Sequence, residues 1–218
     1  MVTLIATGHN EQGVCNSNEL YKIIERIAPE VIFEEVPPNK FAAVYEGTCE
    51  DSLETCAIKM YLKKYPILHF PVDMEIDDIT KRRFREDLSK ISFIFNDYSS
   101  EYNYLSNQLN FLSEQMGFSY LNSDQCRELL ERKHFLEDEI LQSLNLEQLT
   151  EAYKAWLNFI DERRNEMIKN IYNHSTNNKY EKALFLIGAE HRRPLMDKIN
   201  EFEKNNKLQL NWKFDYFK

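Results

Sequence analysis

The feature that most constrains the fold is the alternation, over the first 75 residues, of short apolar runs with segments of helical periodicity. Val2–Ala6, Val31–Phe33 and Ile67–Val72 have the length and β-branched content of buried strands. Residues 17–28 and 52–64 between them place apolar side chains at helical spacing. A strand–helix–strand–helix–strand order predicts a parallel sheet with right-handed crossovers.

The middle of the chain has a different pattern. From about residue 77 to 173, apolar and aromatic residues recur at helical spacing and no strand is predicted. Aromatic stripes of this kind are typical of helix packing rather than of a cofactor site. We therefore expect a long helical insertion that can form a cap over the sheet, followed by a polar loop at Asn173–Asn178.

The last part of the chain returns to the strand–helix–strand pattern. Ala183–Ile187 predicts a strand closed by Gly188, followed by a helix with Pro194 in its first turn and a half-exposed strand at Leu208–Trp212. The predicted fold class is α/β, with a central, mainly parallel sheet flanked by helices and a long helical insertion between the third and fourth strands. It forms a single domain over residues 1–218 with three parts: 1–75, 76–178 and 179–218.

Composition argues against several functions. The chain has 27 Lys and Arg against 36 Asp and Glu, a net charge of −9, which disfavours binding to a phosphate backbone. No stretch approaches the roughly 18–20 apolar residues of a membrane span, and the first residues are typical of a strand rather than a signal peptide. We expect a cytoplasmic protein with no nucleic-acid or membrane partner. Its four cysteines form no C-x-x-C pair and predict reduced thiols: Cys15, Cys49, Cys56 and Cys126.

Histidine and acidic residues follow four of the predicted strands. His9 follows the first, Glu34 and Glu35 end the second, Asp73 follows the third, and His191 follows the strand after the insertion. If these strands are parallel, their carboxyl ends share one edge of the sheet, where open α/β sheets bind ligands. Such a cluster is suited to hold a divalent metal or to supply a general acid and base.

Each of these residues also has an ordinary structural interpretation. A single His after a strand is more often a turn or capping residue, and Asp73 is a possible cap of the following helix. Arg192 and Arg193 are placed to recognise an anionic group at a helix N-terminus, or simply lie in solvent. His69, inside a strand, is expected to be a satisfied core or edge histidine rather than a ligand.

Four ordered motifs together resemble the TraB/TIKI group of the erythromycin-esterase-like superfamily. They are Gly8-His9, Pro29-Glu30-Val31-Ile32-Phe33-Glu34-Glu35, Arg164-Asn165-Glu166-Met167 and Gly188-Ala189-Glu190-His191. The resemblance spans almost the whole chain. One position departs from the family pattern, since Ala6 stands where a G-x-x-H motif has glycine, whereas the second G-x-x-H is intact.

The resemblance implies a hydrolytic site. His9 and His191 match the two family histidines, Glu35 the acid at the strand end with Glu34 as its neighbour, and Arg164 the family arginine, with Arg163 as the alternative. Because adjacent helical positions lie about 100° apart, we expect only one of these arginines to face the site. Some relatives are regarded as metal-dependent proteases, the erythromycin-esterase branch as activating water by His and Glu without a metal, and a related branch as binding haem.

The resemblance thus implies a hydrolase acting on an ester or amide of a small molecule or peptide. We expect His9, Glu35 and His191 to hold a divalent ion (manganese, cobalt or zinc) or a water, and Glu35 to take the proton from the attacking water. Arg164 neutralises the oxyanion or a substrate carboxylate, while Arg192, Asp73 and Glu34 contact substrate. The alternative is a non-catalytic regulatory protein that binds a small ligand or peptide at the same place.

Overall fold

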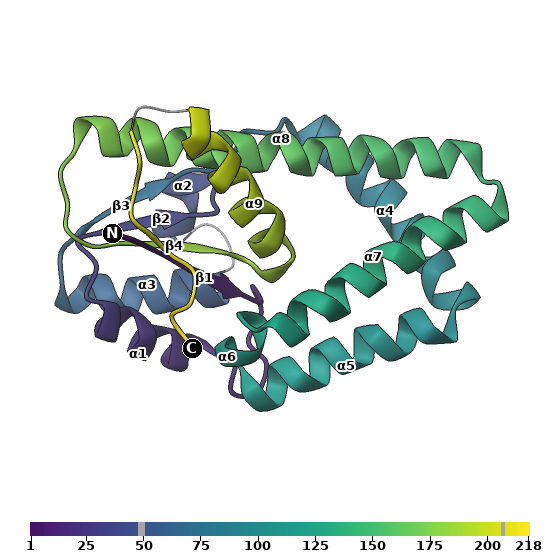
Figure 1. Cartoon of the computed structure of the whole chain (residues 1–218), viewed down its shortest axis with the longest axis horizontal. Coiled ribbons are helices and arrows are strands. Elements are labelled where there is room, and N and C mark those ends of the chain that lie inside the picture. Colours follow the sequence, from purple (N-terminus) through teal and green to yellow (C-terminus); the bar gives the residue numbers. More distant parts are fainter. Residues whose placement is uncertain (48–50, 206–207) are drawn as a thin grey trace.

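A computed structural model, which describes residues 1–47, 51–205 and 208–218, has a five-stranded, all-parallel sheet with helices on both faces (Figure 1). The strand order is β3-β2-β4-β1-β5, so the strand that follows the insertion lies between β1 and β2. This confirms the predicted α/β class. The strands of the described part are β1 (Val2–Thr7), β2 (Val31–Glu34), β3 (Leu68–Pro71), β4 (Ala183–Gly188) and β5 (Trp212–Lys213).

Several helices begin where the sequence supplies a capping side chain. Asn16 accepts a hydrogen bond from the Glu19 backbone N–H, Ser52 from that of Thr55, and Asp77 from those of Ile79 and Thr80. The helices of the described residues are α1 (Ser17–Ile27), α2 (Pro38–Tyr45), α3 (Leu53–Lys64), α4 (Asp78–Tyr98), α5 (Ser100–Met116), α6 (Phe118–Leu121), α7 (Asp124–Leu144), α8 (Glu147–Asn177) and α9 (Ala189–Asn205).

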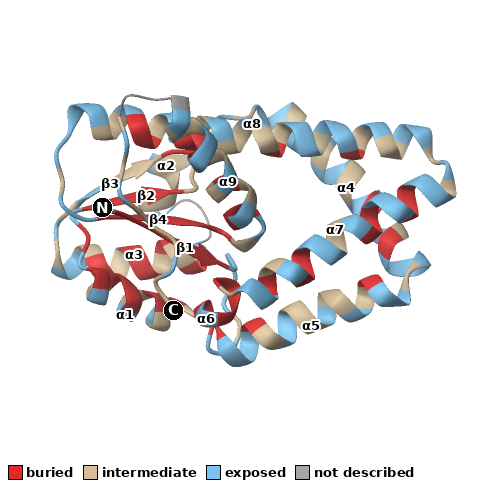
Figure 2. Ribbon diagram, in the orientation of Figure 1, coloured by how far each residue is buried: buried red, intermediate tan, exposed pale blue. Residues whose placement is uncertain are grey.

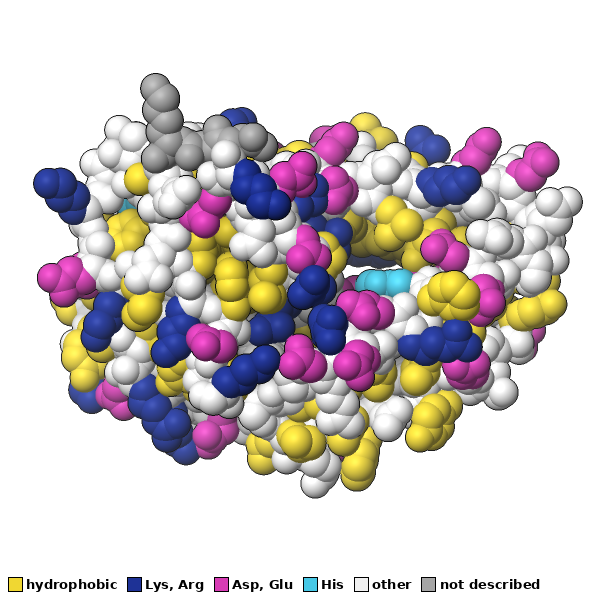
Figure 3. Space-filling model, viewed as in Figure 1, with side chains coloured by type: hydrophobic (Ala, Val, Ile, Leu, Met, Phe, Trp, Pro, Cys, Tyr) yellow, Lys and Arg dark blue, Asp and Glu magenta, His cyan; other side chains and the backbone are white. Residues whose placement is uncertain are grey.

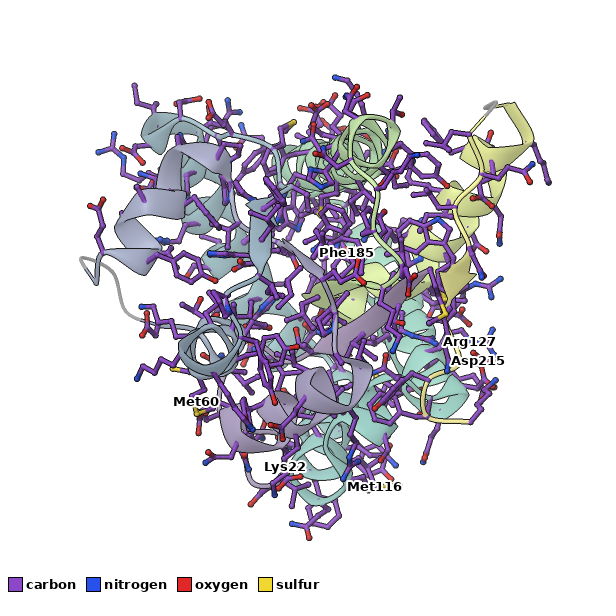
Figure 4. All side chains as sticks on the ribbon, turned by 90° about the vertical axis from the view of Figure 1, so that its left-hand side faces the viewer. Lys22, Met60, Met116, Arg127, Phe185 and Asp215 are labelled. Carbon is purple, nitrogen blue, oxygen red and sulfur yellow. The ribbon has the colours of Figure 1, made fainter. Side chains whose placement is uncertain are left out.

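Helices cover each face of the sheet and create two apolar cores. On one face α1 and α3 pack with α6, around residues such as Leu20, Ile58 and Leu184. On the other face α8 and α9 pack against Phe33 and Phe185. Figure 2 shows the central strands β1, β2 and β4 buried between these layers, and Figure 4, viewed from the end opposite the insertion, shows Phe185 near the centre of the molecule.

The insertion, α4–α8, extends beyond the carboxyl ends of the strands as a second body of helices (Figure 1). Its own core contains Ile91, Phe95, Ile140 and Tyr153. Helix α8 joins the two bodies, because its 31 residues span about 46 Å at 1.5 Å per residue. Its first half packs in the insertion core and its second half on the sheet, so the insertion is held over the strand ends.

Several local predictions were wrong. The expected loop at Asn173–Asn178 continues α8 to Asn177, because the preceding turn is buried against the sheet. The final strand is only Trp212–Lys213, paired with the start of β1. Helix α9 begins at Ala189, so Pro194 lies beyond its first turn. Helix α2, which begins at Pro38, was not predicted from the sequence.

Two further expectations concern the chain's environment. Within the described residues, no helix is both long enough and apolar enough to cross a bilayer. Cys15, Cys56 and Cys126 are free thiols. Cys49 lies outside the described residues.

Candidate active site at the carboxyl edge of the sheet

Glu35, directly after β2, is the centre of the polar cluster at this edge. Its Oε1 accepts a hydrogen bond from Arg163 Nη2 at 2.8 Å and lies 3.2 Å from His191 Nε2. Its Oε2 accepts from the Gly188 backbone N–H at 2.7 Å. Burial alone would raise the pKa of this carboxyl group, but the hydrogen bond from His191 and the positive charges of His9 and Arg163 hold its pKa at about 2.

Arg163, on α8, is fixed by a second carboxylate. Its Nε and Nη2 donate to the two oxygens of Asp73 at 3.0 and 2.7 Å, a bidentate pair, while Nη2 also reaches Glu35. Asp73 is 4% exposed. The ion pair therefore ties α8 to the loops after β2 and β3, and Asp73 positions Arg163.

His9 follows β1 and is held from one side by Glu54, at the start of α3. Its Nδ1 lies 2.9 Å from Glu54 Oε1, which also accepts hydrogen bonds from the His9 backbone N–H at 3.2 Å and from the Thr7 hydroxyl. The hydrogen bond to Glu54 is the largest influence on the ring and raises the pKa of His9 to about 9. His9 Nε2, on the opposite side of the ring, lies 3.8 Å from Glu35 Oε2.

The backbone of His9 is also unusual. Its φ of 57° is left-handed, a conformation that non-glycine residues adopt rarely and at a cost of about 1–3 kcal/mol. Its carbonyl accepts a hydrogen bond from the Leu53 N–H at 3.0 Å, and its own N–H donates to Glu54. The start of α3 thus keeps the His9 ring in place despite this strain, and the side chain stays half-exposed.

Gly188, the last residue of β4, leaves room for the His9 ring. A Cβ at this position would lie 2.6 Å from His9 Nε2 and 3.5 Å from Glu35 Oε2. Any other residue would force the imidazole to move. The intact G-x-x-H motif therefore supplies both the small residue against the first histidine and the second histidine, His191.

Arg164, next to Arg163 on α8, contacts the other side of His191. Its Nε donates to His191 Nδ1 at 3.2 Å. Within the described residues no carboxylate oxygen lies within 4.0 Å of this guanidinium, and burial lowers the pKa of Arg164. A guanidinium only donates, so His191 Nδ1 is an acceptor and the proton of the neutral ring is on Nε2, facing Glu35.

These groups line a cavity of about 490 Å³ between the strand ends and the insertion, here called the sheet-edge cavity. Figure 3 shows the opening between the two bodies, with charged side chains around its rim. The structure brings His9, Glu35, Arg164 and His191 together in this cavity. Arg163 lines it as well, so the expectation that only one arginine faces it was wrong: both long side chains reach the same space.

Three predicted substrate-binding residues lie elsewhere. Glu34 is buried and bonded to the Tyr45 hydroxyl and to His69 Nδ1, each at 2.6 Å, because successive strand residues point to opposite faces. Arg192 points away and donates to the Phe214 carbonyl at 2.7 Å. Asp73 is paired with Arg163. None of the three residues Glu34, Asp73 and Arg192 lines the sheet-edge cavity.

Sequence reasoning missed Glu54. An acid in the first turn of a helix ordinarily serves the helix dipole, and nothing in the pattern distinguishes this one. Ala6, in contrast, stood out because it departs from the family motif. It lies within β1, and its backbone N–H and carbonyl form hydrogen bonds with the Asn122 side chain. Because Ala6 is fully buried, its side chain belongs to the core and not to the site.

The predicted metal ligands do not fit a metal in this arrangement. The described residues contain no group of three or more His, Cys, Asp or Glu side chains that could hold an ion. His191 presents a protonated Nε2 rather than a lone pair, and both oxygens of Glu35 accept hydrogen bonds from protein groups. We therefore derive no step through a metal.

Comparison with known proteins adds no assignment: no family model, no curated protein and no solved structure matches the chain.

Proposed function

We propose that the protein is a hydrolase of the TraB/TIKI-like type, in which His9 is the general base that activates water to attack an ester or amide carbonyl. The observation that carries the proposal is the His9–Glu54 pair. Glu54 holds Nδ1 of the ring, and His9 lines the sheet-edge cavity. A histidine oriented by a carboxylate at one ring nitrogen is the recurring arrangement of catalytic bases.

In this proposal His9, and not Glu35 as expected from the sequence, takes the proton from water. A carboxylate whose pKa is held at about 2 is a weak base near neutral pH. Glu35 instead positions the two histidines and balances the charge of Arg163. His9 Nε2 takes a proton from water as the water oxygen bonds to the carbonyl carbon. The oxyanion is stabilised by Arg164, and His9 returns the proton to the leaving oxygen or nitrogen as its bond to carbon breaks.

This role predicts a characteristic pH dependence. The charged groups facing His9 are Glu54, Glu35 and Arg163, and together they set its pKa at about 9. Only the neutral imidazole accepts a proton, so turnover should rise with pH and level off above about 9. Glu54→Gln removes the strongest influence on the ring and should move the midpoint of this profile towards 6.5.

The test is the hydrolysis of a panel of acyl esters and anilides between pH 6 and 10, corrected for spontaneous hydrolysis. His9→Gln should lower kcat/KM about 100-fold or more. The matched control is His69→Gln, which changes a histidine that is also bonded to a carboxylate but lies outside the sheet-edge cavity. Undiminished turnover in folded His9→Gln, or a pH midpoint that Glu54→Gln leaves in place, would refute the role of His9.

A binding protein without catalysis is the second candidate. It is favoured by one observation: Glu35 and Asp73 are already neutralised by Arg163, so the cluster is stable without a substrate. Equal thermal unfolding with and without EDTA, manganese, cobalt or zinc is expected under both candidates. A rise in Tm on addition of one of these metals would instead support a metal site at His9, Glu35 and His191.

A further inference from the structure

The wall of the sheet-edge cavity that faces the strand ends is apolar and comes from the insertion. Helices α4 and α8 present a continuous set of side chains there: Leu88, Ile91, Phe95, Trp156, Leu157 and Ile160. Ile91, Phe95 and Ile160 are at most 5% exposed, so this side of the cavity is built into the insertion core. Cavities of this size that are apolar over most of one wall bury the hydrophobic part of a small ligand.

The lining of the cavity as a whole has a small excess of positive charge although the chain is acidic. Four positively charged side chains line it, counting His9 as protonated below pH 9, against three carboxylates: His9, Lys133, Arg163 and Arg164 against Glu35, Glu137 and Glu190. The whole chain has a net charge of −9. The local excess of positive charge therefore belongs to this cavity and not to the surface in general, and it favours an anion.

Arg164 is the cation that remains available for such an anion. Arg163 is paired with Asp73 and Glu35, and Lys133 lies 3.8 Å from both Glu137 and Glu190. Arg164 donates through Nε to His191 and, within the described residues, has no carboxylate within 4.0 Å. A half-buried guanidinium that lines a cavity and has no carboxylate of the described residues in direct contact is a good site for a carboxylate, because charge-assisted hydrogen bonds are strongest where water is excluded.

We propose that the substrate is an ester or amide of a hydrophobic acyl group, whose apolar body lies against the α4–α8 wall and whose carboxylate product binds Arg164. The inference rests on the proposed hydrolase function. Hydrolysis adds water across the acyl bond and leaves a carboxylate on the acyl side. The same guanidinium that stabilises the oxyanion thus binds the product anion, while the apolar wall selects the acyl chain.

Binding is measured without catalysis through Trp156, which lines the wall. The chain has two tryptophans, and Trp212 packs on the sheet with Tyr172 and Phe214, so Trp212→Phe isolates the signal of Trp156. Three probes share one apolar chain and differ in charge: octanoate, octan-1-ol and octylammonium. We expect octanoate to quench or shift the fluorescence with a Kd at least tenfold lower than octan-1-ol, and octylammonium to bind most weakly.

Two variants separate the parts of the site. Arg164→Gln should weaken octanoate tenfold or more and leave octan-1-ol within twofold, whereas Arg164→Lys should retain part of the preference for octanoate. Leu157→Asn, on the exposed side of the wall, should weaken both probes by a similar factor. Circular dichroism and thermal unfolding establish that each variant is folded.

The failures of the two proposals are distinguishable. Equal affinities for octanoate and octan-1-ol, or an octanoate affinity that Arg164→Gln leaves unchanged, would overturn the proposed ligand class whatever the activity of the enzyme. Octanoate binding through Arg164 with no turnover of octanoyl esters between pH 6 and 10 would retain the ligand class. That result would overturn the hydrolase in favour of a protein that binds hydrophobic carboxylates.

Discussion

The two sides of the sheet-edge cavity are stabilised in different ways. On the sheet side, Arg163 contacts Asp73 and Glu35 at 2.7–3.0 Å, and β1, β2 and β4 are buried throughout. On the insertion side, Lys133 lies 3.8 Å from each of its two carboxylates. Most of the exposed large apolar side chains of the described residues also lie on the insertion: Ile79, Phe93, Tyr98, Tyr104, Phe111, Met116, Phe135 and Leu157.

This difference suits the sheet side to hold the reacting groups and the insertion side to select the ligand. Groups that must hold a reacting atom need fixed geometry, and short ion pairs on a buried sheet supply it. A helical wall with many exposed apolar side chains tolerates changes of shape, as recognition of varied apolar groups requires. Substitutions on the sheet side should therefore reduce stability and kcat, whereas those on the insertion side should alter KM and selectivity.

The largest expected effect comes from removing Arg163. Arg163→Met leaves Glu35 and Asp73 buried without their shared cation, which should lower the free energy of unfolding by about 3–5 kcal/mol. The matched control is Arg164→Met on the adjacent position, which breaks no ion pair and should cost less than about 1 kcal/mol. Urea denaturation measures both. Equal losses in the two variants would show that the ion pairs do not stabilise the sheet side.

A smaller loss is expected from the buried hydrogen bond of the insertion. The Tyr153 hydroxyl donates to Glu137 Oε2 at 2.5 Å, so Tyr153→Phe leaves a buried carboxylate oxygen without this donor. The expected loss is about 1–3 kcal/mol, against a change within about 0.5 kcal/mol for Tyr98→Phe on the insertion surface. A loss as large as that of Arg163→Met would remove the contrast between the two sides.

Gly188→Ala tests how precisely the sheet side holds His9. The new Cβ would lie 2.6 Å from His9 Nε2, and the half-exposed ring is able to move away, so we expect the variant to fold. Moving away from Glu54 should lower the pKa of His9 from about 9 towards 6.5, as followed by NMR titration, and should reduce kcat about tenfold. Gly8→Ala, whose Cβ meets only ordinary contacts at 3.7 Å, should change neither.

The sequence predicted where the two histidines lie better than it predicted their partners, for physical reasons. Parallel strands must end at one edge, so His9 and His191 could be brought together from their positions after apolar runs alone. Glu54 could not, because its role depends on how α3 packs against the loop after β1. The end of α8 was missed because burial of Ile171 and Tyr172 against the sheet overrides the polar composition that follows them.

The length of the arginine side chains also limited what could be predicted from the sequence. Helical geometry places Arg163 and Arg164 in different directions, yet both guanidinium groups line the sheet-edge cavity, one bound to carboxylates and one to an imidazole. Spacing along a helix fixes where a side chain starts. Which partner it meets is decided by the elements packed against it, and these were visible only in the three-dimensional structure.

The last prediction concerns how the free energy of unfolding depends on pH. This dependence should differ between substitutions at the charged sheet edge and substitutions on the apolar α4–α8 wall. The folded-state pKa of His9, about 9, lies above the ordinary value of 6.5. The resulting stabilisation is complete below pH 6.5 and is lost as pH rises through 9. The pKa of Glu35, about 2, lies below its ordinary value of 4.5, so its contribution is present above pH 4.5 and is lost as pH falls towards 2.

Urea denaturation of the wild-type chain and His9→Gln across pH 6 to 10 measures the alkaline part of this dependence. The advantage of the wild-type chain should be constant up to about pH 6.5 and should shrink as the imidazolium loses its proton. Leu157→Asn on the apolar wall should instead show an offset from the wild-type chain that does not vary with pH, because no proton is exchanged at that position. A parallel pH dependence for both variants would mean that the sheet edge is not organised around the charge of His9.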